Sequence, residues 1–250
     1  MDRTKQTGFS DYSVRISRRA RRLQVRITSS GSVEVVLPHR MSPRHIAPFV
    51  SEHREWIVRT QARLMAERRN IPALHRYLPE SISLYAVDRH YDVCVRLESG
   101  RRGRVTDAPG VLTVFAASES AAAGLLRQWL SGMARQYLVP WLRDVSRELE
   151  LPFHRVTIRG QKTRWGSCSS RGTISLNRAL LLLDRDLVRY LFVHELCHTV
   201  HMNHSRRYWK TVAGIEPRYR NYEQQLNRAT MLMPLWLTHD SPPATRLGLK

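Results

Sequence analysis

The chain has 250 residues, 42% of them hydrophobic, which is enough for a packed core in one large domain or two small ones. It contains no run of 18 apolar residues and begins without the apolar stretch of a signal peptide, so neither a membrane span nor secretion is expected. Its formal net charge of +20 favours non-specific attraction to nucleic-acid phosphates over sequence reading, unless the charge only keeps the protein soluble.

The first part of the chain, residues 1–116, is predicted to be β-rich with one long helix. Alternating apolar and polar residues predict strands, and the Ser-Ser-Gly run at 29–31 predicts a hairpin turn. The helix is expected to open at Ser42-Pro43 and to continue to Leu64. The strands are expected at 12–16, 23–27, 33–37, 82–84, 91–95 and 111–115, with a basic turn at 100–103.

The second part, residues 117–236, is predicted to combine helices with short strands. Its first helix is capped by Ser118 or Ser120, and Pro140 either kinks it or separates it from a helix over 141–150. A later helix begins at Asp184 or Asp186. The strands are expected at 156–159 and 173–177.

The most informative motif is His194-Glu195-Leu196-Cys197-His198, which falls on that later helix. Its spacing puts His194 and His198 one turn apart on the same helical face, so both can reach one zinc ion at about 2.0–2.1 Å. Glu195 between them can hold and deprotonate a water on the metal. The other side of this helix is apolar, which predicts burial and suits a metal site because dry walls strengthen electrostatic interactions.

A catalytic zinc needs a third protein ligand and an open position. His201 shares the face of the pair, but on a straight helix it lies roughly 7 Å beyond the midpoint of the pair. His204 reaches the metal only if the chain folds back, which Asn203 as a helix stop and Ser205 as the cap of a following helix would permit. His204 is therefore preferred. The next candidates are Glu216 and Glu223.

Five blocks of the sequence stand in a specific order: Arg164–Cys168, Ile174–Asn177, His194–His198, Asn203–Ser205 and Trp209. Together they resemble the YgjP-like metallopeptidases, a family related to the SprT and Wss1 type of zinc peptidase, over roughly residues 12–228. The resemblance implies a gluzincin-like or minimal zincin core. It also implies His194, His198 and His204 as zinc ligands and Glu195 as the general base. Two positions depart from the family: Tyr208, where phenylalanine is more common, and Asp184, where proline is common.

Three residues are predicted to bind substrate: Arg164, Trp165 and Asn177. Strand 173–177 is expected to be either an exposed edge that pairs with an extended peptide or an ordinary internal strand. Arg164 would hold a substrate carbonyl or phosphate, and Trp165 would form a wall of the cleft. In the structural alternative, Trp165 lies in the core and Arg164 pairs with a carboxylate.

These observations predict an α+β fold, with a zincin-like catalytic core over 117–236 and a disordered tail over 237–250. The predicted activity is that of a zinc-dependent peptidase. Its expected partners are peptide or protein substrates, and no membrane partner is expected. An odd number of cysteines without C-x-x-C spacing fits the cytoplasm. One alternative is a metal-dependent hydrolase of nucleotide phosphoanhydrides, with Arg159 and Arg164 neutralising charge. The other is a nucleic-acid-associated protein with a structural zinc, which would leave Glu195 without a purpose.

Overall fold

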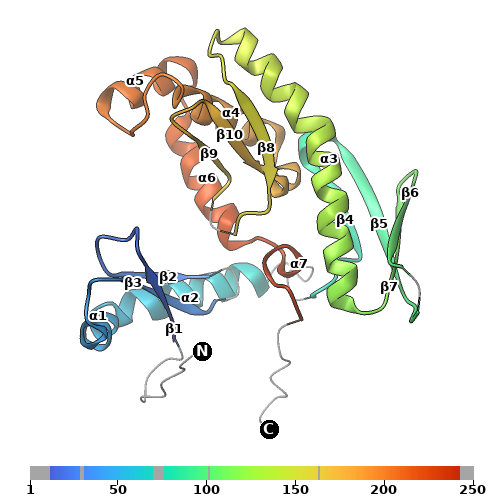
Figure 1. Ribbon diagram of the computed structural model, residues 1–250, viewed down its shortest axis with the longest axis horizontal. Coiled ribbons are helices and arrows are strands. Elements are labelled where there is room, and N and C mark those ends of the chain that lie inside the picture. Colours follow the sequence, from blue (N-terminus) through green and yellow to red (C-terminus); the bar gives the residue numbers. More distant parts are fainter. Residues whose placement is uncertain (1–11, 29–30, 70–75, 101, 163, 243–250) are drawn as a thin grey trace. The chain divides into compact units, whose positions relative to one another are not determined.

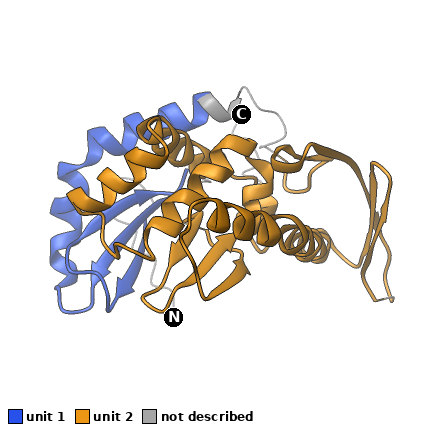
Figure 2. Cartoon of the chain, turned by 90° about the horizontal axis from the view of Figure 1, so that it is seen from above, with its two compact units in different colours: residues 1–75 blue, residues 76–250 orange. Residues whose placement is uncertain are grey.

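A computed structural model of the chain describes residues 12–28, 31–69, 76–100, 102–162 and 164–242. The fold is α+β, as predicted, and its strands form three small mixed sheets (Figure 1). The chain divides into two compact units, Met1–His75 and Arg76–Lys250 (Figure 2). Among the described residues, none of the helices is both long and apolar enough to cross a membrane.

The first unit contains a three-stranded sheet and two α-helices. Its strands β1 (Tyr12–Ser17), β2 (Gln24–Ile27) and β3 (Val33–Pro38) lie in the order β1-β3-β2, with β1 parallel and β2 antiparallel to β3. The central strand β3 is the most buried, and it forms a small core with α1 (Ile46–Glu52) and α2 (Arg54–Arg69).

The predicted long helix of this unit is interrupted. A 3-10 turn, η1 (Pro43–His45), follows Ser42, and α1 ends at Glu52 with His53 as its C-cap, before α2 begins at Arg54. The backbone N–H of His53 donates to Phe49 O at 3.2 Å, and its ring Nδ1 lies 2.9 Å from the same oxygen. The apolar spacing therefore predicted helix correctly, but it did not indicate the break at His53.

The second unit opens with a four-stranded sheet that packs on a long helix. The strands β4 (Ser81–Leu84), β5 (Arg89–Leu97), β6 (Arg104–Ala108) and β7 (Val111–Ala116) lie in the order β4-β5-β7-β6. The short 3-10 turn η3 (Tyr85–Val87) joins β4 to β5. The sequence did not predict β6, because this edge strand is mostly exposed and lacks an apolar alternation.

Helix α3 (Glu119–Glu148) packs along this sheet and carries a buried stripe of ten residues. Ser118 is its N-cap, and the serine hydroxyl accepts a hydrogen bond from Ala121 N at 3.2 Å. Pro140 lies inside the helix and does not split it. The predicted boundary between 116 and 117 falls inside the second unit, because β7 and the helix after it share one core.

The remaining elements surround a second three-stranded sheet. Strands β8 (Arg155–Arg159), β9 (Gly166–Cys168) and β10 (Thr173–Asn177) lie in the order β8-β10-β9, so β10 is the central strand. The expectation that 173–177 is an exposed edge is therefore wrong, and the internal alternative holds. The helical elements that follow are η4 (Arg178–Leu182), α4 (Arg185–Cys197), α5 (Arg206–Ile215), α6 (Tyr219–Met231) and α7 (Leu235–Thr238).

The segment predicted as a disordered tail begins inside α7. Leu237 and Thr238 are buried there, and α7 is tied to α3 because Arg127 donates to Trp236 O at 2.8 Å and to His239 O at 2.9 Å. Residues 243–250 lie outside the described residues.

Candidate metal centre

Helix α4 presents the two histidines of the H-E-x-x-H motif from a buried helix. Asp184 is the N-cap residue, although its side chain makes no capping hydrogen bond. The apolar side of the helix is buried, and Glu195 is only 4% exposed. The imidazole centroids of His194 and His198 lie 5.2 Å apart, as expected for side chains one helical turn apart.

The chain folds back directly after α4. Tight hydrogen bonds from Thr199 N to Leu196 O and from Val200 N to Cys197 O close the helix. Among the described residues, Asn203 is not one of those with a positive φ, so the expected left-handed stop is wrong. Ser205 caps α5 as predicted, accepting from Tyr208 N at 3.4 Å.

This fold-back brings His204 to the histidine pair. Nε2 of His204 lies 3.3 Å from Nε2 of His194, and the ligand atoms of His194, His198 and His204 all lie within 4.8 Å of one another. Two nitrogens at about 2.0–2.1 Å from a tetrahedral zinc are about 3.3–3.4 Å apart. The separation of the two Nε2 atoms therefore fits a shared zinc ion.

His201 contributes its backbone instead of its ring. Nδ1 of His198 lies 3.0 Å from the carbonyl oxygen of His201, and an Nδ1–H tautomer would donate to it. That hydrogen bond leaves Nε2 of His198 as the available ligand atom. The His201 ring is not part of the cluster of ligand atoms.

Glu223 lies behind His194. Its Oε1 accepts a hydrogen bond from the Tyr190 hydroxyl at 2.6 Å and lies 3.3 Å from Nδ1 of His194, close enough for an ion pair but without full hydrogen-bond alignment. Burial raises the pKa of Glu223, but contacts with His194 and Tyr190 outweigh burial and hold it below its ordinary value. Glu216 instead accepts from Arg218 N at 3.1 Å. Neither glutamate belongs to the three-residue cluster.

Aromatic rings enclose the three histidines. Tyr208 stacks on His198 with a centroid distance of 4.6 Å and an interplanar angle of 21°. Its hydroxyl donates to His194 O at 3.1 Å, which phenylalanine at this position could not do. Trp209 stacks on His204 at 5.4 Å and 24°, which steadies a histidine that comes from a loop.

Glu195 lies against the backbone of strand β9. A Cβ atom added to Gly166 would lie 2.5 Å from Oε1 and 2.9 Å from Cδ of Glu195, so no larger residue fits without moving the carboxylate. Burial raises the pKa of Glu195 to about 7, although His194 and Arg164 act to lower it. Its buried Oε2 has no hydrogen-bond partner among the described residues. A buried carboxylate oxygen without a partner is uncommon in native proteins and indicates that a bound group completes its hydrogen bonding.

The three predicted substrate-binding residues separate in the structure. The Trp165 side chain is buried, and its Nε1 donates to Leu226 O at 3.0 Å and to Thr230 Oγ1 at 2.8 Å. The Asn177 amide donates to Gln161 O and Arg164 O and accepts from Ala179 N. These contacts give Trp165 and Asn177 structural roles. Arg164 is exposed, and its charge acts on Glu195.

Sequence reasoning missed the residues that support the ligands. Tyr190 lies four residues before His194, and this one-turn spacing was the available signal for it. The sequence suggested Glu223 only as a candidate third ligand of the metal. Gly166 lies in the Arg164–Cys168 block, but nothing in that block indicates its contact with Glu195, which lies 29 positions further along the chain.

One family model and several solved structures match this chain. A family model described as YgjP-like, metallopeptidase domain, matches residues 21–229. No curated protein matches the chain. The metallopeptidase zymogen abylysin of Pyrococcus abyssi is 28% identical, with coverage of 35% of this chain and 90% of its own and a TM-score of 0.33. The zymogen jannalysin of Methanocaldococcus jannaschii is 19% identical, with coverage of 35% and 91% and a TM-score of 0.32.

Proposed function

Since this chain belongs to the YgjP-like metallopeptidase domain family, we propose that it is a zinc-dependent peptidase that hydrolyses peptide bonds. The observation that carries the proposal is the cluster of His194, His198 and His204 beside the buried Glu195. Three imidazoles form a donor set typical of catalytic zinc, which keeps its fourth position for water or substrate. When bound, zinc would act as a Lewis acid and lower the pKa of a water at its open position.

Glu195 is the proposed general base. Glu195 follows His194 directly in α4, and its carboxylate lies against Gly166 of β9, where the absence of a side chain leaves space for it. Burial brings its pKa to about 7, so near neutral pH it can accept a proton from the attacking water and return one to the leaving amine. The proton therefore moves from water to Glu195 and then to the amine nitrogen.

Strand β9 is the proposed docking edge for the substrate backbone. It forms one edge of the sheet, and its hydrogen bonds to β10 involve Trp165, Ser167 and Ser169. Because pairing alternates along an antiparallel strand, the N–H and C=O groups of Gly166 and Cys168 face away from β10. An extended peptide could pair with these groups and place a carbonyl beside Glu195.

Tyr190 and Glu223 are proposed as positioning residues for His194. A carboxylate facing the second nitrogen of a metal-binding imidazole fixes its tautomer and raises its basicity. Oε1 of Glu223 faces Nδ1 of His194, so Nε2 of His194 points towards His204 and is available to a metal. The Tyr190 hydroxyl donates to the same carboxylate and fixes its position. Arg164 keeps a proposed role in substrate binding because its exposed charge acts at the base.

The decisive experiment compares the wild-type protein with Glu195→Gln. Both should retain about one zinc per chain, and only the wild type should cleave an unbiased peptide library. Turnover of nucleoside triphosphates without peptide cleavage would favour the phosphoanhydride hydrolase. Zinc retention without any turnover in the wild type would favour a structural zinc. Fractionation of cells that express the tagged chain would test the proposed cytoplasmic location.

A further inference from the structure

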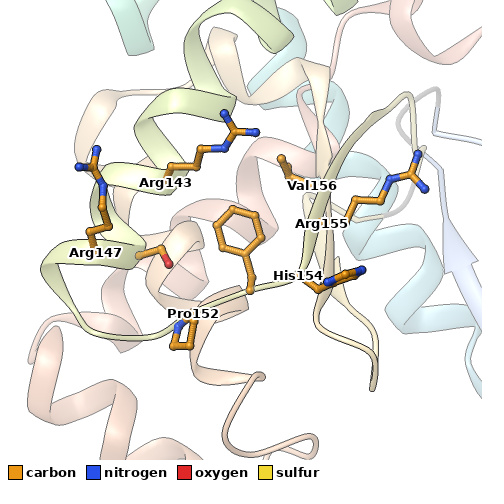
Figure 3. A pocket seen from close by; sticks show the side chains of 8 residues that line it. Arg143, Arg147, Pro152, His154, Arg155 and Val156 are labelled. Carbon is orange, nitrogen blue, oxygen red and sulfur yellow. The ribbon is translucent and has the colours of Figure 1, made fainter.

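A cavity in the second unit lies where the end of α3 meets the start of β8 (Figure 3). Its volume is about 500 Å³, within the range of small-molecule sites. It shares no residue with the metal centre. Its lining residues are Arg143, Ser146, Arg147, Pro152, Phe153, His154, Arg155 and Val156.

The cavity is strongly basic. Arg143 and Arg147 come from α3 and Arg155 from β8, so the guanidinium groups stand on two sides of the cavity (Figure 3). Arg147 pairs with Asp144, but Arg143 and Arg155 form no ion pair among the described residues. No acidic residue lines the cavity, and the nearby Glu148 pairs with Arg189. Two positive charges are therefore left for an anion.

The floor of the cavity is apolar. Phe153 is half-buried and packs against the core of the unit, with Pro152 and Val156 beside it. The Ser146 hydroxyl donates to Leu151 O at 2.7 Å, so it is already used within the chain. A matching ligand therefore combines a flat apolar part with an anionic group.

We propose that this cavity binds a nucleotide, either free or unpaired within a single strand. Its base would lie against Phe153, and its phosphate would pair with Arg143 and Arg155. A guanidinium group can donate two hydrogen bonds to the oxygens of one phosphate, and an aromatic ring can stack on any of the bases. An acidic peptide could use the charges but has no planar ring for the apolar floor. The formal net charge of +20 favours the approach of such anions. The site does not depend on the proposed peptidase activity.

The first test separates this cavity from general charge. Anisotropy of a labelled eight-nucleotide single strand is measured with wild type, with Arg143→Gln/Arg155→Gln, and with the control Arg18→Gln/Arg21→Gln. The control removes two arginines of the first unit that are likewise exposed. The cavity variant should bind at least about tenfold more weakly, and its log–log salt slope should be shallower by about 0.7, the change expected for the loss of one phosphate contact. Equal weakening in both variants would overturn the proposal.

The second test concerns the base. Phe153→Leu keeps an apolar side chain but removes the ring, so binding should weaken about fivefold or more, as expected for the loss of one stacked base. An abasic strand should bind wild type and Phe153→Leu equally. Circular dichroism checks that the variant folds. If Phe153→Leu unfolds, the Arg143→Gln/Arg155→Gln variant still tests the proposal, because both arginines are exposed.

Competition then identifies the source of the nucleotide. Displacement of the labelled strand by AMP indicates a free nucleotide, whereas displacement only by unlabelled single strand indicates a nucleotide within a chain. A duplex of the same sequence should compete poorly because its bases are stacked. If a glutamate octapeptide competes as well as the strand, the cavity recognises carboxylates and the nucleotide assignment is wrong.

Discussion

Replacing Glu223 should weaken zinc binding although Glu223 is not expected to touch the metal. The same carboxylate oxygen, Oε1, faces both Nδ1 of His194 and the Tyr190 hydroxyl. In Glu223→Gln, an amide oxygen can still occupy that place, so the variant removes mainly the negative charge. In Glu223→Ala, both contacts disappear.

The magnitude follows from this difference. Loss of a carboxylate behind a zinc-binding histidine typically costs 10–100-fold in metal affinity. We therefore expect Glu223→Gln near the tenfold end and Glu223→Ala near the 100-fold end, or about 1.4 and 2.7 kcal/mol. Tyr190→Phe keeps the Glu223 carboxylate but removes the hydrogen bond that fixes it. Its loss of zinc affinity should therefore not exceed the loss in Glu223→Ala.

Competition with a chromogenic chelator measures the zinc Kd of each variant without any substrate. Glu216→Gln is the matched control, because Glu216 contacts Arg218 N and lies outside the histidine cluster. The reasoning fails if Glu223→Ala holds zinc as tightly as wild type, or if Glu216→Gln loses as much affinity as Glu223→Ala.

Three further predictions follow from the site. His204→Ala should lose zinc sharply while His201→Ala keeps it, because only the His204 ring joins the cluster; equal metal content in both purified variants would refute the assignment. Gly166→Ala should lower the free energy of unfolding by roughly 1–3 kcal/mol, since its Cβ collides with a buried carboxylate; an unchanged denaturant midpoint would contradict this. At pH 8, Cys168 should react with iodoacetamide far more slowly than the exposed Cys94, because burial raises the pKa of the Cys168 thiol to about 11 and leaves about one thiolate in a thousand; similar labelling rates by mass spectrometry would count against it.

Local signals in the sequence predicted much of this site. The strand at 173–177 has the bounds of β10, and the hydroxyls of Ser118 and Ser205 cap the helices that were expected after them. The distance argument against His201 follows from helix geometry over a few residues, and Ser205 as the cap of a new helix allowed the chain to fold back at His204. Such features depend on residues that are close together in the chain, so they can be predicted from a single sequence.

Features that depend on distant partners were not predictable in the same way. The alternation in 173–177 indicates a strand but not whether β8 and β9 cover both of its edges. Trp165 was assigned to the cleft in one interpretation, yet its ring lies against Leu226 and Thr230, some 60 residues later in the chain. The grouping of residues 76–116 with the rest of the second unit likewise depends on packing against α3.

The contact between Gly166 and Glu195 has an evolutionary consequence. Glycine is required at position 166 only while a glutamate side chain occupies the space beside it. In a descendant that had lost the glutamate, selection would no longer hold position 166 to glycine, and larger residues would accumulate there. The two positions should therefore change together, and a homologue with a bulky residue at position 166 is expected to lack the glutamate at position 195 even if its three histidines are kept.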